Sequence, residues 1–329
     1  MYTLGIETSC DETSCAILKG YRVLSNVTIS SLKEHRKYGG VIPEIATRAH
    51  LKNIDKVFSE ALTQAGVTLN KIDLIAATYK PGLIGALVVG FNFAKALACC
   101  LHKPFLGVNH LYGHLFAPFL NSKKRPTFPF LGLVVSGGHT EIYRVNDFDR
   151  ITLLGQTKDD ACGEVYDKIA TAYGLGYPGG PIIDKLFNPA YKNAFKFKCG
   201  RDGLDLSFSG IKTALVYKKL EFEKKGLWNR VTKIKLISSF QNAAVSAIVD
   251  AITEAVHTCG IKKVVCGGGV VANSYLRSML RLHEKAGVRF LLSPMPYTSD
   301  NAAVVAGLGF YLYNTKKQVS KNDLEAEPN

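Results

Sequence analysis

The sequence predicts an α/β protein built from two related units. Residues 4–18 and 130–145 each have the pattern of a strand, a small polar turn containing Ser and Thr, and a second strand. Each of these hairpins is followed by helices and further strands, an alternation typical of α/β folds. A pattern that recurs within one chain indicates an internal duplication. The length of 329 residues fits two such units.

Composition indicates a soluble, cytoplasmic protein. Hydrophobic residues make up 47% and charged residues 21%, a normal globular profile. The chain starts without a charged segment followed by an apolar run, so we expect no secretory signal. The most apolar window, residues 81–101, is interrupted by glycines, Asn92 and Lys95, which favours a buried helix over a membrane span. The 8 cysteines form no C-x-x-C pair, which is typical of reduced cytosolic thiols.

The charge balance indicates a polyanionic partner. The formal net charge is +14, and such a field attracts nucleic acid and raises its encounter rate. A generally basic, solvated surface is the alternative interpretation. The positive residues gather in clusters, within 33–37, 123–125, 192–201, 218–235 and 277–285.

The remaining elements follow from local patterns. Pro43 stands at a first helical position, apolar residues recur from Ile45 to Ala65, and Gly66 follows, so we expect a helix with both start and stop signals. Asp159 is expected to open a helix with an acidic first turn, and a long helix is expected to end near Cys259. Further strands are expected at 72–78, 105–108, 263–266 and 290–292, and further helices at 81–101, around Asp184, from Ser207, after 273 and after 301.

A pair of histidines follows the strand at 105–108. His110 and His114 are four residues apart on an apolar background. On a helix this spacing places both imidazoles on one face, within reach of a single metal ion. Two ordinary polar positions on a helix surface would give the same spacing, so both interpretations stand at this point.

Two other stretches carry polar groups that could bind a ligand. The turn of the first hairpin contains hydroxyls together with Asp11 and Glu12, so it could present backbone N–H groups to a phosphate and carboxylates to a cation. An ordinary hairpin turn has a similar composition. The strand at 263–266 ends in three glycines before a helix, a place where bare backbone could pack beside a nucleotide. Asp300, just before the last helix, fits a plain N-cap.

Taken together, these segments resemble the bacterial branch of the tRNA threonylcarbamoyladenosine transferases, the TsaD family once described as O-sialoglycoprotein endopeptidases. The resemblance covers nearly the whole chain, and its motifs are specific jointly. They are, in order, Gly5-Ile6-Glu7-Thr8-Ser9-Cys10-Asp11-Glu12-Thr13, Tyr38-Gly39-Gly40-Val41-Ile42-Pro43-Glu44, Pro81-Gly82-Leu83, His110 with His114, Val135-Ser136-Gly137-Gly138-His139-Thr140, Tyr177-Pro178-Gly179-Gly180-Pro181, Phe208-Ser209-Gly210-Ile211-Lys212-Thr213, Gly268-Gly269-Val270 with Ala272-Asn273, and Asp300-Asn301.

The resemblance implies the actin/Hsp70/sugar-kinase (ASKHA) fold, with two lobes of related α/β topology and a nucleotide cleft between them. We expect residues 1–109 to form the N-terminal lobe, completed by the C-terminal helix. Residues 110–329 are expected to form the C-terminal lobe, with the metal and adenylate sites. The tail from Lys316 is not expected to take part in the chemistry.

The resemblance also implies a reaction. A threonylcarbamoyl group passes from threonylcarbamoyl-AMP to the exocyclic amine of the adenosine 3′ of the anticodon, in tRNAs reading codons that begin with A, and AMP leaves. By resemblance, His110, His114 and Asp300 are the ligands of one divalent ion, Fe²⁺ or Zn²⁺, and Mg²⁺ could accompany the nucleotide. Asp11 or Glu12 could relay a proton. The adenylate-binding positions implied are Val134, Val135, Ser136, Gly137, Gly138, Asp167, Gly180, Asp184 and Asn273.

The same resemblance implies protein partners, and it leaves competing functions to weigh. We expect TsaB-like and TsaE-like partners, a possible homodimer, and no membrane association. The main alternative is an ATP-dependent phosphotransferase of the same fold, a sugar or carboxylate kinase. Kinases of this fold generally hold Mg²⁺ through carboxylates and phosphates, so a histidine pair argues against the phosphotransferase. A metalloprotease would need H-E-x-x-H, but Leu111 follows His110. A purely structural tRNA-binding protein would not need the histidine pair.

Overall fold

The first sheet has five strands in the order β3-β2-β1-β4-β5. Strands β1, β2 and β3 pair antiparallel, and β4 and β5 extend the sheet in parallel from β1. Successive side chains of a strand point to opposite faces: Leu4 and Ile6 of β1 join a core that includes residues of α2 and α3, while Gly5 meets α10. The strands are β1 (Tyr2–Glu7), β2 (Glu12–Lys19), β3 (Arg22–Ser30), β4 (Leu74–Lys80) and β5 (Phe105–Asn109).

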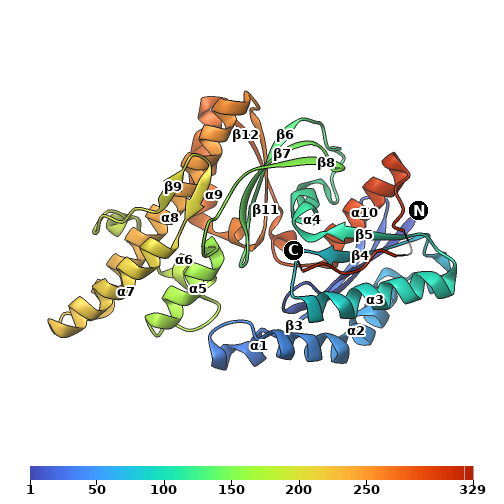
Figure 1. Ribbon diagram of the computed structural model, residues 1–329, viewed down its shortest axis with the longest axis horizontal. Helices are drawn as coiled ribbons and strands as arrows, with labels where there is room; N and C mark the ends of the chain where they lie inside the picture. Colours follow the sequence, from blue (N-terminus) through green and yellow to red (C-terminus); the bar gives the residue numbers. More distant parts are fainter. Residues whose placement is uncertain (322, 329) are drawn as a thin grey trace. The chain divides into compact units, whose positions relative to one another are not determined.

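Helices cover both faces of this sheet. Figure 1 shows α10 on one side of the first sheet and α2 and α3 on the other. Gly5 permits the approach of α10, because a Cβ at this position would lie 2.4 Å from the carbonyl oxygen of Ala302. The helices of this unit are α1 (Leu32–His35), η1 (Arg36–Tyr38), α2 (Pro43–Ala65), η2 (Leu69–Lys71), α3 (Ile84–Leu101), α4 (His110–Phe116), η3 (Ala117–Phe119), η7 (Met295–Tyr297) and α10 (Ala302–Lys316).

The second sheet repeats the same pairing pattern. Its order is β12-β11-β6-β7-β8, with β6, β7 and β8 antiparallel and β11 and β12 added in parallel to β6. The predicted α/β class with two related units is therefore confirmed. The strands are β6 (Phe130–Val135), β7 (Thr140–Asp147), β8 (Arg150–Gln156), β11 (Lys263–Gly267) and β12 (Arg289–Leu292), with a separate pair β9 (Gly200–Asp202) and β10 (Asp205–Ser207).

The core of this unit packs the apolar side chains of β6 against helices α5 and α8. Leu131, Leu133 and Val135 of β6 belong to the same buried cluster as Val165 of α5 and Ile248 of α8. The helices are α5 (Cys162–Ala172), α6 (Gly179–Leu186), η4 (Pro189–Tyr191), α7 (Ser209–Lys224), α8 (Arg230–Cys259), η5 (Gly269–Ala272), α9 (Ser274–His283) and η6 (Glu284–Ala286).

The division between the units differs from the expected boundary after residue 109. This computed structural model describes residues 1–321 and 323–328, and one unit comprises Met1–Thr127 and Ser293–Asn329, the other Phe128–Leu292. Helix α4 stays with the first unit because it packs on α10, where a Cβ at Gly113 would lie 3.2 Å from the Val304 side chain. The histidine pair and Asp300 therefore both lie in the first unit, not in the second as expected. The C-terminal helix α10 belongs to the first unit.

The elements differ from the sequence prediction in several places. Strands β3, β8, β9 and β10 are absent from it. Helix α3 begins at Ile84, not at Pro81. Helix α5 begins at Cys162, because Asp159 has another role: its Oδ1 accepts hydrogen bonds from the backbone nitrogens of Phe208, at 2.8 Å, and Ser209, at 3.3 Å. Asp159 thus satisfies N–H groups at the start of α7, which would otherwise lack partners.

Two helices, α3 and α8, are long and apolar enough to cross a membrane by length and composition alone. Helix α8 contributes buried residues along much of its length to the core of the second unit. The buried residues of α3 include Leu87, Phe91, Ala94 and Ala98, spaced as one helical face that packs into the core of the first unit. Core helices pass the same test, so this finding is weak evidence for a membrane.

Candidate metal centre and adenylate-binding segments

Helix α4 brings the two histidines together at its start. Asn109 is its N-cap, and the side-chain oxygen accepts hydrogen bonds from the backbone nitrogens of Leu111, at 2.9 Å, and Tyr112, at 3.2 Å. One turn separates His110 from His114, and their ring centroids are 4.6 Å apart. His110 is 6% exposed and His114 is fully buried. Burial of both rings excludes the alternative of two polar positions on a helix surface.

Asp300 completes the cluster from the loop before α10. Asn301, not Asp300, caps α10, because its side-chain oxygen accepts from the Val304 nitrogen at 3.3 Å. The backbone nitrogens of Ala302 and Ala303 donate to the side chains of Ser14 in β2 and Asn26 in β3. These hydrogen bonds join the start of α10 to the sheet. The Asp300 carboxylate therefore faces the histidines, with Oδ1 3.2 Å from His114 Nε2 and 3.5 Å from His110 Nε2.

This donor set fits a divalent transition metal. One ligand atom from each of the three side chains lies within 4.8 Å of the others. Two imidazoles and one carboxylate suit iron or zinc and leave coordination positions open for a substrate. Nδ1 of His114 has no hydrogen-bond partner among the described residues, so the imidazole is oriented by packing and by its Nε2 contact.

A fourth buried side chain orients His110. Oε2 of Glu7, at the end of β1, lies 2.9 Å from His110 Nδ1. Two further hydrogen bonds hold this carboxylate, because Thr78 Oγ1 donates to Oε2 and the Ser9 nitrogen donates to Oε1, both at 2.5 Å. An ionised carboxylate only accepts hydrogen bonds, so Nδ1 carries a proton. His110 Nε2 is then the nitrogen available to a metal, as in carboxylate–histidine–metal arrangements.

Electrostatics around His110 follow from these contacts. Burial alone lowers the pKa of an imidazole, but the carboxylates of Asp300 and Glu7 outweigh it and raise the pKa of His110 well above its ordinary value. Burial likewise opposes ionisation of the two carboxylates. The His110 charge overcomes this opposition and lowers the pKa of both Glu7 and Asp300. Without a metal, the cluster therefore holds a protonated His110 between two ionised carboxylates.

The acidic turn between β1 and β2 lies in the same unit. Ser30 Oγ donates to Asp11 Oδ2 at 3.4 Å, and Asp11 is 8% exposed. Burial, together with the charges of Asp11 and Asp300, raises the pKa of Glu12 well above its ordinary value. The sequence predicted Asp11 and Glu12 as proton-relay residues. The structure places Glu12 where the Asp300 charge influences it.

In the second unit, the predicted adenylate-binding segment 134–138 runs from the end of β6 into a tight turn. The Ser136 nitrogen donates to the His139 oxygen at 2.8 Å, and the start of α5 packs on this turn, since the Gly163 nitrogen donates to the Ser136 oxygen at 3.2 Å. Gly268 has a φ of +98° and a Cβ there would lie 2.4 Å from the Val135 oxygen. The glycine run after β11 therefore allows direct backbone contact with the end of β6. A Cβ at Gly137 or Gly138 would meet no atom within 4 Å.

The other predicted adenylate residues form two hydrogen-bonded groups, one at Asp167 and one around Asp184. Asp167 Oδ1 accepts from the Gly179 nitrogen at 2.6 Å, which fixes the start of α6, where Gly180 follows. Asp184 accepts from Gln241 Nε2 at 3.2 Å and from both the nitrogen and the hydroxyl of Ser274. Gln241 also accepts from Asn273 Nδ2 at 3.2 Å. A carboxylate offers about four acceptor sites, so Asp184 keeps capacity for a ligand.

Sequence reasoning missed two members of these clusters. Glu7 stood inside a quoted motif but received no role, although an acidic residue ending an otherwise apolar strand is unusual. Gln241 is fully buried within α8, and a polar residue at a core position of a helix was the signal that could have identified it. Both residues act through the predicted ones: Glu7 through His110, and Gln241 through Asp184 and Asn273.

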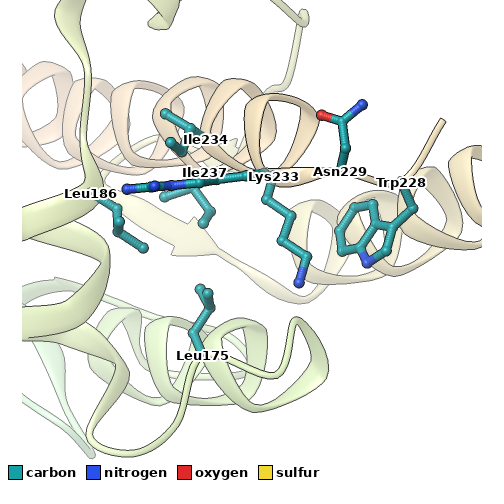
Figure 2. A pocket seen from close by; sticks show the side chains of 8 residues that line it. Leu175, Leu186, Trp228, Asn229, Lys233, Ile234 and Ile237 are labelled. Atoms are coloured by element: carbon teal, nitrogen blue, oxygen red, sulfur yellow. The ribbon is translucent and has the colours of Figure 1, made fainter.

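Figure 2 shows a pocket of about 310 Å³ in the second unit, between the end of α6 and the start of α8. It is mainly apolar, with Lys233 pointing along its wall beside Trp228. None of the predicted site residues lines it. The lining residues are Leu175, Leu186, Trp228, Asn229, Arg230, Lys233, Ile234 and Ile237.

Comparison with known proteins identifies the family. The model of the TsaD family, tRNA N6-adenosine threonylcarbamoyltransferase, matches residues 22–307. The chain belongs to this family. A relative from Thermosipho africanus with that name is 46% identical over 334 residues, covering 100% of this chain and 99% of the relative. Relatives of the same name from Clostridium perfringens and Borreliella afzelii are 45% and 43% identical, covering 99% and 95% of this chain and 96% and 90% of their own lengths.

Solved structures agree on the fold. Full-length HypF, in a phosphate- and nucleotide-bound crystal form, superimposes with a TM-score of 0.61 at 14% identity, covering 96% of this chain and 46% of HypF. An activator of 2-hydroxyisocaproyl-CoA dehydratase from Clostridium difficile has a TM-score of 0.50 at 13% identity, covering 98% of this chain and 99% of the activator. At such low identity these similarities indicate the fold alone, which is the two-lobed α/β fold that the sequence predicts.

Proposed function

We propose that this chain transfers a threonylcarbamoyl group from threonylcarbamoyl-AMP to N6 of the adenosine 3′ of the anticodon, in tRNAs reading codons that begin with A. Family membership and the shared name of its relatives support the reaction. The observation from the structure that carries most weight is the cluster of His110, His114 and Asp300, in which both imidazoles are buried, because kinases of this fold generally hold Mg²⁺ through carboxylates and phosphates.

In this reaction a bond forms between N6 of adenosine and the carbonyl carbon of the donor. The bond from that carbon to the phosphate oxygen breaks, AMP leaves, and N6 loses a proton. An exocyclic aromatic amine is a poor nucleophile, so positioning and charge stabilisation must supply most of the acceleration. His110, His114 and Asp300 would hold one divalent ion, Fe²⁺ or Zn²⁺, which when bound supplies Lewis acidity toward a donor oxygen.

The proton lost by N6 requires an acceptor near the metal centre. Asp11 and Glu12 occupy the acidic turn of the first unit, and the raised pKa of Glu12 brings this carboxyl closer to the range in which general bases are efficient. Glu12 is therefore the better candidate of the two. Glu7 is excluded from this role, because its side chain is fully buried and already orients His110.

The second unit would hold the adenylate part of the donor. The turn of residues 136–138 offers backbone N–H groups and open space above its glycines, which suits a phosphate. Asp167 and Asp184 are suited to ribose hydroxyls, and Asn273 is joined to Asp184 through Gln241. The positions proposed for the adenylate are thus Val134, Val135, Ser136, Gly137, Gly138, Asp167, Gly180, Asp184 and Asn273. Mg²⁺ could accompany the nucleotide.

The partners proposed are tRNA, attracted by the net charge of +14, and TsaB-like and TsaE-like proteins. A homodimer and a cytoplasmic location complete the proposal. Size-exclusion chromatography with light scattering distinguishes a complex with the TsaB-like and TsaE-like proteins from a homodimer, since each assembly has a distinct mass.

The test is a reconstituted reaction. The protein, its TsaB-like and TsaE-like partners, synthetic threonylcarbamoyl-AMP and unmodified tRNA are combined, and nucleosides are analysed by mass spectrometry. We expect threonylcarbamoyladenosine to appear and AMP to be released in equal amount. A tRNA with another base 3′ of its anticodon is the matched control and should give no product. ATP hydrolysis stimulated by a small metabolite, without any modified nucleoside, would instead support the phosphotransferase.

A further inference from the structure

The segment between α1 and α2 forms a closed loop at the surface of the first unit. Residues 36–41 include η1 and two glycines, the first with a φ of +70°. His35, which is fully buried, joins the two ends of this loop, because its Nδ1 accepts a hydrogen bond from the Ile42 nitrogen at 3.2 Å. The loop therefore projects from a fixed base.

The same imidazole connects the loop to the acidic turn. Since Nδ1 accepts a hydrogen bond, the neutral ring carries its proton on Nε2, which lies 3.1 Å from Ser31 Oγ. Ser31 in turn donates to the Asp11 oxygen twice, from its hydroxyl and from its nitrogen, both at 2.9 Å. A continuous series of hydrogen bonds therefore runs from the Ile42 nitrogen through His35 and Ser31 to the Asp11 backbone.

A second buried histidine holds the other side of that turn. His50 of α2 has Nε2 3.0 Å from the Cys10 oxygen and Nδ1 2.9 Å from Thr13 Oγ1. The Cys10 carbonyl can only accept, so Nε2 is again the protonated nitrogen and Thr13 donates to Nδ1. Segments on both sides of the loop are therefore bonded to consecutive backbone carbonyls, those of Cys10 and Asp11. The loop and the turn carrying Glu12 are therefore joined by hydrogen bonds through His35, Ser31 and His50.

The loop presents an exposed aromatic ring among cations. Tyr38 is 53% exposed, and Lys37 Nζ lies 4.8 Å from the centre of its ring. Lys33 and Arg36 are also exposed, whereas the nearby Glu44 is already paired with Arg48 at 2.7 Å, which leaves Glu34 as an opposing charge. An exposed aromatic side chain beside cations is the combination with which proteins stack unpaired bases and hold their phosphates.

We propose that residues 36–41 are a tRNA-contacting element of this protein, in which Tyr38 stacks on an unpaired base of the anticodon loop and Lys37 and Arg36 contact the neighbouring phosphates. This inference rests on the proposed function. The anticodon loop fits because its bases are unpaired and because the acceptor adenosine lies within it. An RNA bound to this loop is held in a fixed position relative to the turn of Asp11 and Glu12, because His35 and Ser31 join the loop to that turn.

The test compares Tyr38→Ala with Tyr38→Phe in the reconstituted reaction. Loss of one base-stacking contact should raise the KM for tRNA by about tenfold or more, with the KM for threonylcarbamoyl-AMP unchanged and Tyr38→Phe close to wild type. Tyr217→Ala is the matched control, since Tyr217 is 67% exposed beside Lys218 in the second unit, and it should leave both constants unchanged. Lys37→Ala should reduce the slope of log KM for tRNA against log salt concentration by about 1.

An unchanged KM for tRNA in Tyr38→Ala would overturn the inference, as would an equal rise in Tyr217→Ala. Thermal unfolding and metal content separate a contact from a folding defect, and both should match wild type because Tyr38 is exposed. Failure of the proposed function looks different, since wild-type protein would then form no threonylcarbamoyladenosine at all.

Discussion

Glu7 Oε2 lies 2.9 Å from Nδ1 of His110, and Oδ1 of Asp300 lies 3.5 Å from the other nitrogen of the same ring. One imidazole is thus held between a carboxylate from β1 and a carboxylate from the loop before α10. The first of these fixes which nitrogen is free for a metal, and the second is positioned to share that metal.

Replacement of His114 by Ala should remove the metal. His114 is fully buried and contributes one of three ligands, so its loss should reduce metal affinity by more than about 100-fold, the upper range for side chains that only support a ligand. Metal content of the purified protein by mass spectrometry is the measurement. His257→Ala, at an exposed position of α8, is the control and should retain the ion. A His114→Ala protein with full metal content would contradict the assignment.

Replacement of Glu7 by Gln should weaken metal binding by about 10- to 100-fold without removing a ligand. The amide keeps the size of the side chain, but it loses the charge that orients His110. Chelator competition gives the affinity directly. Glu44→Gln removes a carboxylate from an exposed ion pair with Arg48 and should leave the affinity unchanged. Equal affinities in wild type and Glu7→Gln would show that Glu7 does not support the site.

Metal binding should release a proton and weaken at low pH. The pKa of His110 is raised in the metal-free fold, so the stability it contributes is fully present below the unfolded value of about 6.5 and lost as the pH rises through the folded value. A bound ion needs this imidazole neutral, so the affinity of the folded protein for the ion should rise by about tenfold per pH unit at every pH below the folded pKa of His110. Calorimetry in buffers of different ionisation enthalpy counts the proton. A pH-independent affinity would rule out a protonated His110.

Replacement of Gly5 by Ala should destabilise the first unit. The added Cβ would lie 2.4 Å from the Ala302 oxygen and 2.8 Å from the Ala306 side chain, so α10 must move from β1. Overpacking of this kind costs about 1–3 kcal/mol, and it should also displace Asp300, which precedes that helix. Urea unfolding measures the cost. Gly210→Ala serves as the control, because a Cβ added at Gly210 would have no atom within 4 Å. No loss of stability is expected for this variant.

Local patterns were sufficient for most of the fold but not for the grouping of its parts. The helix of α2 was predictable because Pro43, a periodic apolar face and Gly66 all agree. The two hairpins indicated the duplication because each has the same short-range pattern. The unit boundary was not predictable, since it depends on the return of the chain at residue 293 and on the packing of α4 against α10, contacts between residues that are far apart in sequence.

The site shows the same contrast. The spacing of His110 and His114 is a local signal, so their shared face could be predicted. The pairing of either histidine with Asp300 joins positions almost two hundred residues apart, and only resemblance to a family supplied it. Glu7 and Gln241 were missed because their roles depend on neighbours from other elements. Asp159 was assigned to the wrong element because its carboxylate bonds to α7 and not to its own helix.

The most direct test of the metal centre is a metal titration of the transfer rate. Protein stripped of metal by a chelator is supplied with increasing Fe²⁺ or Zn²⁺, and threonylcarbamoyladenosine formation is measured at each step with TsaB-like and TsaE-like partners, threonylcarbamoyl-AMP and tRNA present. We predict negligible transfer without metal and a rate that rises in proportion to the ion and levels off at one equivalent per chain, with no such rise in a His110→Ala/His114→Ala protein. Full transfer by the stripped protein would contradict a metal centre at His110, His114 and Asp300.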